Sequence, residues 1–509
     1  MKKSNIKIVY IDSLVNIVES FKVQGKIVAQ AHGVFDIIHP GIIKHLHDAK
    51  SQSDVLCVTV IKDKDVRRGP DRPIFSEKLR AENVASLSIV DYVCIVDDQI
   101  PFECVKRLKP DIFAKGQGYK ERDETIFEKI FTVEKELYLG QSKILETGAD
   151  PLCSSDIISK FIHVYPEETK SFLYQFSEKY TFKYIVEKLH ALKNLKVLLI
   201  GDGIIDEYVY IKTMGKSPKA QIIVTQYLTE EVFLGGVFAI ANHIAGICDN
   251  VHMVTLLGEE DSRENFICKT MKPNVSRRFF YRNNASTIIK RRYINQYQNQ
   301  KMFEINYIDD TYLDIASESK IIEYLNTIIH DYDVVLVSDF GHGFISKNII
   351  SFLESSDKKI AVNTQTNGAN VGYNLITKYG HAYYICLDGS EARLAVRDKY
   401  AEFEDVARIL FRKLRTEYLI ITMGSSGSMC ISRNDMITRT PAFSTKVVDI
   451  IGAGDAFFSF TSLCFAINMN VDIVSFIGNA VGALAVQIVG NKKPVEKHEL
   501  LEFIHNVLQ

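Results

Sequence analysis

The sequence lacks any strong excess of charge and any ordered cysteine pattern. Its 61 lysine and arginine residues nearly balance 63 aspartate and glutamate residues, which leaves a net charge of −2. No overall field therefore favours nucleic acid or an anionic membrane as a partner. The nine cysteines are scattered and form no CxxC pair. This pattern excludes a disulfide framework and a clustered zinc site, and it is typical of a reducing compartment.

Long apolar runs are also missing. The first residues are basic, but residues 6–18 are interrupted by polar and charged side chains. Neither a signal-peptide core nor a membrane-spanning helix is predicted. A content of 46% hydrophobic and 24% charged residues is typical of globular proteins. The 509 residues are too many for one core, so we expect a cytoplasmic protein of two or three domains.

The most informative stretch is Gly452-Ala453-Gly454-Asp455, between a β-rich approach and an apolar segment predicted to be a helix. Glycines allow backbone N–H groups to converge at a helix N-terminus, where a phosphate can bind. An aspartate at this point suits a base that accepts a hydroxyl proton during phosphoryl transfer. The alternative is a glycine-rich turn in which Asp455 is only an N-cap.

The first 165 residues alternate apolar strands with helices. We expect strands at 26–31, 54–61 and 92–96, with helices at 43–50 and 77–87. This alternation predicts a parallel α/β sheet whose ligands bind at the carboxyl ends of the strands.

The segment after the first expected strand resembles the cytidylyltransferase-like nucleotidyltransferases, whose motif is G-x-F-D-x-x-H-x-G-H. The residues that match this motif, and the later matches near the nucleotide, are Gly33, Phe35, Asp36, His39, Gly41, Lys115, Ser154 and Ser155. The resemblance implies a Rossmann-like domain in which a phosphate attacks the α-phosphorus of CTP or another nucleoside triphosphate. Cationic and hydrogen-bonding groups around the phosphates, His39 among them, would then carry the catalysis.

One position departs from that family. Ile42 stands where the motif has its second histidine, so one donor near the developing charge is lost. Removal of such a donor typically lowers the rate by about a hundredfold or more. A degenerate nucleotide-binding domain is therefore an alternative to an active transferase. His39 could also be no more than a histidine at the start of a helix.

Residues 166–194 are predicted to form a helical linker, either one amphipathic helix or two short ones. A domain over residues 195–509 follows, with buried strands predicted near 196–200, 334–339, 359–363, 382–387 and 418–422. The β-rich runs within 208–233, together with those at 277–281 and 286–306, are expected to form a small β lid over a cleft. A turn at residues 234–236 is expected to begin a helix of small residues.

This second domain resembles the ribokinase, or PfkB, family of sugar kinases. It is similar to the kinase half of the bifunctional heptose-phosphate kinase/adenylyltransferases of ADP-heptose synthesis. The resemblance makes Asp455 the catalytic base and Gly452, Ala453 and Gly454 the anion hole. It implies ATP and Mg²⁺ as cofactors, with Glu391 acting on the metal through water. It also implies nucleotide contacts at Gly424, Gly427 and Asn479, and substrate contacts at Asp206, Gly235, Gly236 and Asp339.

Several positions depart from the heptose kinases. Ala239 and Asp388 replace asparagines, His342 replaces a lysine, and the run from Asn363 to Asn367 replaces a phosphate-handling D-x-K-G motif. These departures predict a remodelled sugar pocket. Lys290 and Arg292 could still receive a substrate phosphate. Alternatively, the two cations belong to a solvated strand face.

The order of the two predicted domains is the reverse of that in the common heptose enzyme. The leading interpretation is a bifunctional sugar-phosphate kinase and sugar-1-phosphate nucleotidyltransferase that makes a nucleotide-activated sugar for surface polysaccharide. The alternatives are a kinase with a degenerate first domain and a catalytically silent nucleotide-binding scaffold. By the same resemblance we expect a homodimer formed through the lid, with small-molecule ligands. The near-zero net charge and the lack of long apolar runs lead us to expect no nucleic-acid or membrane partner.

Overall fold

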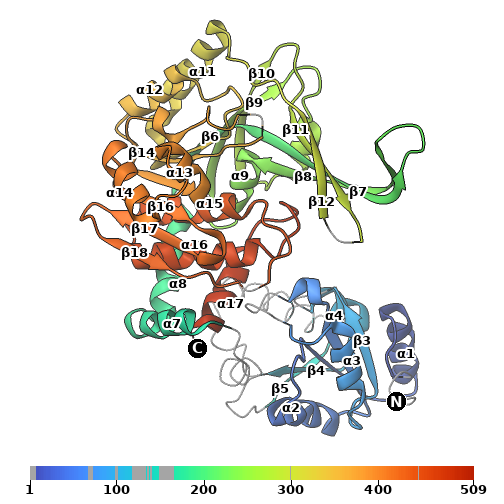
Figure 1. Cartoon of the computed structure of the whole chain (residues 1–509). Coiled ribbons are helices and arrows are strands. Elements are labelled where there is room, and N and C mark those ends of the chain that lie inside the picture. The colour runs from blue at the N-terminus through green and yellow to red at the C-terminus, as the bar shows by residue number, and fades with distance from the viewer. Residues whose placement is uncertain are drawn as a thin grey trace. The chain divides into compact units, whose positions relative to one another are not determined.

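A computed structural model of the chain describes residues 7–66, 73–97, 101–116, 133, 137, 140–147, 165–297, 300–368, 370–444 and 446–508. The chain forms two compact units, one of Met1–Pro166 with Leu501–Gln509 and the other of Glu167–Leu500 (Figure 1). None of the helices in the described ranges has the length and apolar character needed to cross a membrane.

The first unit is built on a five-stranded sheet in which every neighbouring pair is parallel. The strand order is β3-β2-β1-β4-β5, with β1 (Val28–Gly33), β2 (Val55–Ile61), β3 (Tyr92–Val96), β4 (Ile112–Gly116) and β5 (Lys143–Thr147). The chain moves outward from β1 to β3 and then returns to the other side of β1. The strand order therefore reverses between β1 and β4, where ligands of open α/β sheets bind.

Helices cover both faces of this sheet. One apolar cluster packs the strands against α2 and α3, and a second packs them against α1 and α4. The helices with described bounds in this unit are α1 (Ile11–Val23), α2 (Pro40–Ser51), α3 (Glu77–Ala85) and α4 (Phe102–Leu108), with a 3₁₀ turn η1 (Asp63–Asp65). The predicted α/β class is confirmed for this half of the chain.

The second unit contains a nine-stranded sheet in the order β10-β9-β6-β13-β14-β15-β16-β17-β18. Only the last two strands run antiparallel to their neighbours. The strands are β6 (Lys196–Gly201), β9 (Asn250–Gly258), β10 (Val275–Arg282), β13 (Val334–Asp339), β14 (Lys359–Thr364), β15 (Tyr384–Asp388), β16 (Tyr418–Thr422), β17 (Ser428–Ser432) and β18 (Ile437–Thr440).

Two layers of helices enclose this sheet. A large apolar cluster joins the strands to α11–α14, while α15 packs on α9, α16 and strands β13–β15. Aromatic stacking joins α7 to α16, where the rings of Phe176 and Phe476 are 4.2 Å apart. The helices in the described part of this unit are α7 (Glu167–Lys179), α8 (Phe182–His190), α9 (Val237–Ala245), α10 (Glu264–Thr270), α11 (Ile315–Ile328), α12 (Lys347–Ser355), α13 (Gly389–Val396), α14 (Phe403–Lys413), α15 (Ala453–Ala466) and α16 (Val471–Ala485). The last helix, α17 (Lys497–Val507), begins in this unit, and its residues from Leu501 onward belong to the first.

A separate four-stranded sheet, called the lid, has the order β12-β11-β7-β8 (Figure 1). Its strands are β7 (Gly203–Lys216), β8 (Ile223–Gly236), β11 (Ile288–Asn295) and β12 (Gln300–Tyr307). The predicted lid is thus present, but two expectations for segments near it were wrong. Residues 277–281 belong to β10, which pairs with β9 in the main sheet. Gly235 and Gly236 end β8 as paired strand residues and do not form a turn.

Candidate active site

Polar side chains gather at the carboxyl ends of β13–β16 and at the start of α15. Parallel strands that share a direction bring their carboxyl ends to one edge of the sheet, which is where α/β proteins place their ligands. Asp339, Asp388 and Thr422 end three of these strands, and Gln365 follows a fourth. The β7 and β11 strands of the lid add charged side chains to the same site through Asp206 and Lys290.

The N-terminus of α15 is built by a left-handed glycine. Gly452 is the N-cap with a φ of 85°, and a Cβ at this position would collide with Asn491 Oδ1. Ala453 N donates to Ile450 O at 3.3 Å, whereas the space where a Cβ of Gly454 would stand is open. The backbone N–H groups of a first helical turn lack intrahelical acceptors and favour anions. The alternative that Asp455 is the N-cap was wrong, because it is the third helical residue.

Asp455 is a buried carboxylate with one strong hydrogen bond. It is 6% exposed, and Gln365 Nε2 donates to its Oδ1 at 2.7 Å. Burial raises the pKa of Asp455 to about 7, and Asp206 adds to the rise while Gln365 and Lys290 oppose it. A carboxylate with a pKa near neutrality is poised to take up a proton.

The lid contributes a compact set of charges around Asp206. Arg292 donates to Asp206 at 2.5 Å and also contacts Glu304 at 2.7 Å. Asn491 donates to the other oxygen of Asp206 at 3.4 Å, so it joins this aspartate to the Gly452 turn. Sequence reasoning missed Asn491, which carries no motif of its own.

Lys290 is 6% exposed and its Nζ lies 5.4 Å from the centre of the Phe340 ring. Burial lowers its pKa. No ion pair forms on its ammonium within the described ranges of the chain. The alternative of a solvated strand face was therefore wrong for Lys290, and the side chain of Arg292 is only 12% exposed.

The two glycines at the end of β8 are required by close contacts. A Cβ at Gly235 would overlap the Oδ2 atom of Asp206. Gly236 has a φ of 53°, and a Cβ there would lie 2.5 Å from the carbonyl oxygen of Asp202. Gly235 thus keeps the backbone close to the Asp206 carboxylate, and Gly236 keeps it close to the backbone at Asp202.

Asp339 ends β13 and is fully buried. Its carboxylate contacts Lys378 at 2.5 Å and accepts a hydrogen bond from the Tyr379 hydroxyl at 2.7 Å. Gly341 N donates to the other oxygen at 3.1 Å. This aspartate, predicted to contact substrate, is therefore already neutralised by protein groups.

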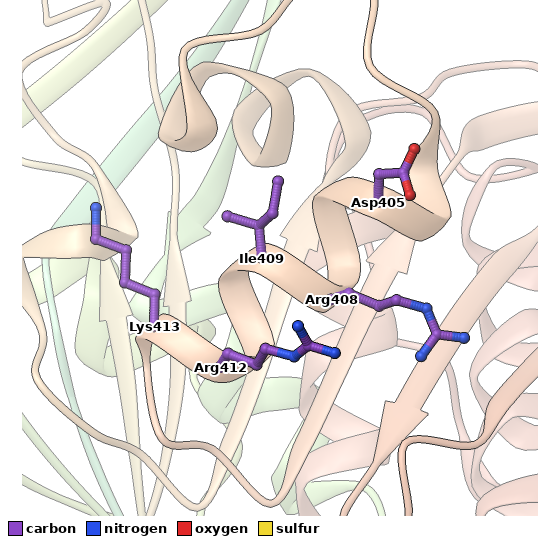
Figure 2. Close-up of a pocket in the computed structure, with 5 residues that line it drawn as sticks. All are labelled: Asp405, Arg408, Ile409, Arg412 and Lys413. Carbon is purple, nitrogen blue, oxygen red and sulfur yellow. The ribbon is translucent and has the colours of Figure 1, made fainter.

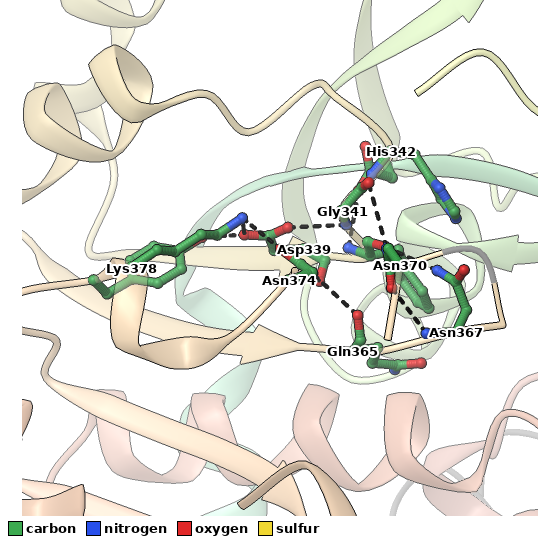
Figure 3. Close-up of polar contacts among 11 residues, drawn as sticks. Asp339, Gly341, His342, Gln365, Asn367, Asn370, Asn374 and Lys378 are labelled. Atoms are coloured by element: carbon green, nitrogen blue, oxygen red, sulfur yellow. Dashed lines mark hydrogen bonds and ion pairs between the residues drawn. The ribbon is translucent and has the colours of Figure 1, made fainter. Parts of the chain in front are cut away.

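A loop rich in asparagine supports the turn after β13 (Figure 3). Asn374 donates to Asp339 O at 2.9 Å and to Gln365 O at 3.0 Å. Asn370 and Asn367 donate to Phe340 O at 2.7 and 3.1 Å. Sequence reasoning singled out residues 363–367 but missed Asn370, Asn374 and Lys378. The two asparagines could have been found from the sequence, because they belong to a cluster of amide side chains that follows the carboxyl end of a predicted strand.

His342 does not replace the positive charge of the lysine found in the heptose kinases. Its side chain is 1% exposed, and burial together with Lys290 lowers its pKa to about 3. The ring is therefore neutral at physiological pH, and the cations near it are Lys290 and Arg282, which donates to His342 O at 3.4 Å.

Glu391 lies in the first turn of α13, where it completes a capping box with Asp388. Its oxygens accept hydrogen bonds from Thr366 N at 2.9 Å and Asp388 N at 3.1 Å. Burial raises its pKa to about 7. Within the described ranges, no cluster of three or more His, Cys, Asp or Glu residues could hold a metal ion alone. A carboxylate with remaining lone pairs fits contact to Mg²⁺ through water and nucleotide phosphates.

The residues predicted at the nucleotide follow β16. Gly424 has a φ of 56° and open space around its missing Cβ. Gly427 has a φ of 83°, and a Cβ there would collide with Thr440 O. Asn479 of α16 donates to Ser428 Oγ at 2.7 Å and to Ser475 O at 2.8 Å. The asparagine therefore supports the glycine turn through its hydrogen bond to Ser428, the residue that follows Gly427.

In the first unit, the predicted motif lies at the point where the strand order reverses. Gly33 ends β1, and His39 is the buried N-cap of α2, with Gly41 in the first helical turn. Lys115 lies near the end of the neighbouring strand β4. The β1–β4 pairing therefore brings Gly33 and Lys115 to one edge of the sheet.

Two residues of this motif shape the loop. Phe35 has a φ of 53°, and its ring lies 3.3 Å from where a Cβ of Gly33 would stand. The Asp36 carboxylate accepts hydrogen bonds from Ile74 N at 2.8 Å and Phe75 N at 2.9 Å. Ser154 and Ser155 lie outside the described residues.

Ile42, which stands where the motif has its second histidine, packs against the core of the first unit. Its side chain is partly buried against the apolar cluster of the sheet. His45, one turn further along α2, is paired with Thr147 Oγ1 at 2.6 Å, and burial lowers its pKa. Thr147 in turn donates to Lys115 O at 3.3 Å. His45 is thus held at the β4–β5 edge as a neutral ring.

A separate open hollow lies on α14 (Figure 2). It is formed along a single helix, and Arg408 is paired with Asp435 at 2.5 Å. A site normally has polar groups that converge from several elements. We therefore do not assign function to this hollow, whose lining residues are Asp405, Arg408, Ile409, Arg412 and Lys413.

Comparison with known families agrees with the two folds. The family described as pfkB family carbohydrate kinase matches residues 230–498, and the cytidylyltransferase-like family matches residues 31–161. The chain therefore belongs to the pfkB carbohydrate kinase family and also carries a cytidylyltransferase-like domain ahead of the kinase domain. The resemblances drawn from the motifs are confirmed at this level.

Curated relatives include two proteins named bifunctional protein HldE. The one from Geobacter metallireducens is 36% identical over 167 residues, which are 32% of this chain and 33% of the relative. The one from Nitratiruptor sp. is 25% identical over 299 residues, which are 58% of this chain and 62% of the relative. Each match spans less than two thirds of the relative's length.

Solved structures support the fold of the kinase half. A mutant of phosphofructokinase-2 from Escherichia coli has a TM-score of 0.51 and 12% identity, and the match covers 62% of this chain and 100% of that chain. The same enzyme in complex with substrates and products gives a TM-score of 0.50 at 11% identity, over 62% of this chain and 100% of the other. At this identity the likeness concerns the fold alone.

Proposed function

We propose that the second unit transfers the γ-phosphoryl group of ATP to a hydroxyl group of a sugar or sugar phosphate. The observation that carries this proposal is the buried Asp455 in the first turn of α15. At the neighbouring Gly454, no atom lies within 4 Å of where a Cβ would stand, which leaves room for a ligand beside the backbone. Asp206 and Lys290 of the lid face this carboxylate. A buried carboxylate, a helix N-terminus and a cation thus lie in one region, and this supports the roles of base, anion site and charge donor that phosphoryl transfer requires.

In the proposed reaction, the substrate hydroxyl oxygen forms a bond to the γ-phosphorus while the bond to the β–γ bridging oxygen breaks. Asp455 accepts the hydroxyl proton, and ADP leaves with the bridging oxygen. The first N–H groups of α15 would stabilise the charge on the transferring group. Asp206, aligned by Arg292, would hold a substrate hydroxyl.

Mg²⁺ would supply charge neutralisation on the nucleotide phosphates when bound. Glu391 would hold it through water, because both of its oxygens already accept backbone hydrogen bonds. Gly424 and Gly427 would allow the adenine nucleotide to approach the backbone, with Asn479 supporting that turn.

We further propose that the first unit couples a sugar 1-phosphate to a nucleotide, with CTP or another nucleoside triphosphate as donor. Support comes from Gly33, His39 and Lys115 at the reversal of strand order, where such ligands bind. Together with the kinase, this activity would make a nucleotide-activated, heptose-like sugar for surface polysaccharide. The packed Ile42 favours the second candidate, a kinase whose first domain only binds nucleotide.

The lid supports the proposal of a homodimer. Side chains alternate across a strand, so Lys290 and Arg292 share a face with Asp206, and the residues between them face away. On that outer face, Phe303 and Ile305 are 51% and 42% exposed. The same face also carries the ion pair between Arg291 and Glu207, so it combines exposed apolar side chains with charges, and we propose that a second copy of the same surface covers it.

Replacement of Asp455 by asparagine tests the kinase proposal. Asp455→Asn keeps the shape and the hydrogen bond from Gln365 but removes the base. We expect ATP binding, measured by isothermal titration with Mg²⁺, to survive. Sugar-dependent release of ADP should fall by about a hundredfold or more.

The matched control is Asp405→Asn on the exposed surface of α14, which should leave both readouts unchanged. A panel of phosphorylated and unphosphorylated hexoses and heptoses supplies the acceptor. If Asp455→Asn retained full ADP release, the assigned base would be wrong. If the wild-type chain bound no nucleotide, the enzyme proposal would fail and the scaffold alternative would take its place.

A further inference from the structure

The segment after β14 contacts two carboxylates of the proposed kinase site through consecutive residues. Gln365 Nε2 donates to Asp455 Oδ1 at 2.7 Å, and Thr366 N donates to Glu391 Oε1 at 2.9 Å. One stretch of backbone therefore fixes the proposed base and the carboxylate proposed to act on the metal. Any displacement of this segment would change both positions together.

The backbone of Gln365 is itself tightly held. Its N–H donates to Asp339 O at 2.9 Å, and its carbonyl accepts from Asn374 at 3.0 Å. Its side-chain amide also donates to Asn363 Oδ1 at 3.1 Å, and Asn363 donates to Cys386 O at 2.9 Å. Figure 3 shows Gln365 beneath the asparagine side chains of this network. The amide is thus held in place before any ligand arrives.

We propose that Gln365 is a positioning residue that holds the Asp455 carboxylate in its ionised, correctly oriented form through the hydrogen bond from its side-chain amide. This inference rests on the proposed function of Asp455 as the base and adds the group that sets its orientation and its working pH range. The amide can only donate through Nε2, so it favours the charged form of the carboxylate.

Of the groups near Asp455, Gln365 makes the hydrogen bond to its carboxylate, whereas the charged groups act on it electrostatically. Asp206 of β7 is a like charge that disfavours ionisation, and Lys290 of β11 is an opposing cation that favours it. Glu391 of α13 is a second carboxylate, and Asp455 and Glu391 repel each other when both are ionised. Burial favours the protonated acid. Among the interactions of the described residues, the hydrogen bond from Gln365 is the direct contact that favours the carboxylate.

The decisive variant is Gln365→Met, which keeps the length of the side chain and removes the amide donor. Without the donor, protonation of Asp455 becomes easier, so the acid limb of the kcat–pH profile should move upward by about one pH unit. At neutral pH we expect kcat to fall by about fivefold, with little change in KM for ATP. At alkaline pH the rate should recover, because the carboxylate is then ionised without help. Gln365→Glu, which adds a like charge, should move the acid limb further in the same direction.

The matched control is Gln487→Met, at a half-buried glutamine whose amide donates only to its own helix at 3.1 Å. It should leave the pH profile unchanged. A purely structural role for Gln365 would lower kcat equally at every pH without moving the acid limb, and that result would overturn the proposal.

A second readout separates this proposal from the proposed function. The carboxylic-acid stretch of Asp455 can be titrated by infrared difference spectroscopy without any substrate, with Asp455→Asn as the blank. The apparent pKa should be higher in Gln365→Met than in the wild type. If the wild type released no ADP with any sugar, the proposed function would fail. This titration alone would then decide whether Gln365 favours the ionised form of Asp455. An unchanged titration in Gln365→Met would refute the role of Gln365.

Discussion

At the scale of single residues, the site depends on the absence of side-chain atoms as much as on charges. Gly235 of β8 lies opposite Ile204 of β7, and its missing Cβ leaves the space that an Asp206 oxygen occupies. Only a glycine allows the carboxylate to keep its contacts with Arg292 and Asn491. The composition of the strand alone could not have shown this steric requirement.

Gly235→Ala should therefore displace the Asp206 side chain and weaken sugar binding. We expect KM for the sugar to rise by about tenfold or more, with ATP affinity unchanged, because Asp206 is proposed to hold a hydroxyl group and not the nucleotide. The control is Gly380→Ala, where the nearest atom to a new Cβ would be 3.5 Å away. Equal losses in sugar and ATP binding would point instead to a general disturbance of the fold.

The proposed base also gives the reaction a pH dependence of known sign. Burial holds the pKa of Asp455 near 7, well above the value of an exposed aspartate. As the pH falls below about 7, the carboxylate is protonated and cannot accept the hydroxyl proton, so kcat should fall about tenfold per pH unit. The shift of this limb in Gln365→Met is the residue-scale test given above.

At the scale of elements, the lid has two faces of different chemistry. The inner face carries the Asp206–Arg292–Glu304 contacts, whereas Phe303 stacks on Tyr293 on the outer face with ring centres 4.6 Å apart. The period-2 alternation of strands explains how one sheet can serve a site and present an apolar surface.

Ile305→Lys places a charge on this outer face and should weaken the proposed homodimer. We expect the molar mass from light scattering to shift from that of two chains toward that of one, because a buried unpaired lysine opposes association. Tyr400→Lys, at a residue that is 82% exposed on the second unit outside the lid, is the control. A wild-type chain that is already monomeric would contradict the dimer proposal.

At the scale of the whole molecule, two units with separate sheets each carry a nucleotide site that we propose. The cytidylyltransferase-like family and the pfkB family match separate parts of the chain. The proposed site of the first unit includes His39 at the start of α2, and that of the second includes the glycine turns after β16 and before α15. The two sites should therefore be separable by mutation.

His39→Ala should remove one of two saturable nucleotide sites in titrations with ATP and CTP, and leave the kinase reaction intact. The substitution removes the imidazole that we propose as a donor to the nucleotide phosphates of the first unit, and it leaves the second unit unchanged. The control is His47→Ala, an exposed histidine on the same helix. A single site that is unaffected by His39→Ala would indicate that the first unit has lost nucleotide binding, in agreement with the change at Ile42.

The sequence alone determined the two α/β halves, the lid, and the motifs at Gly33–Gly41 and Gly452–Asp455. These features come from local periodicity, glycine spacing and helix starts, which depend on neighbours in the chain. The sequence placed residues 277–281 in the lid and treated Gly235–Gly236 as a turn, because β propensity does not reveal which sheet a strand joins.

Only the tertiary structure decided which of these residues meet. It brought Gln365 onto Asp455, which are 90 positions apart, and Asn491 onto Asp206, which are 285 positions apart. It also showed that Asp339 is neutralised by Lys378 and that Lys290 is buried without an ion pair in the described part of the chain. Burial and long-range contacts set the charge state of each group. These depend on the packing of distant elements and leave no local pattern in the sequence.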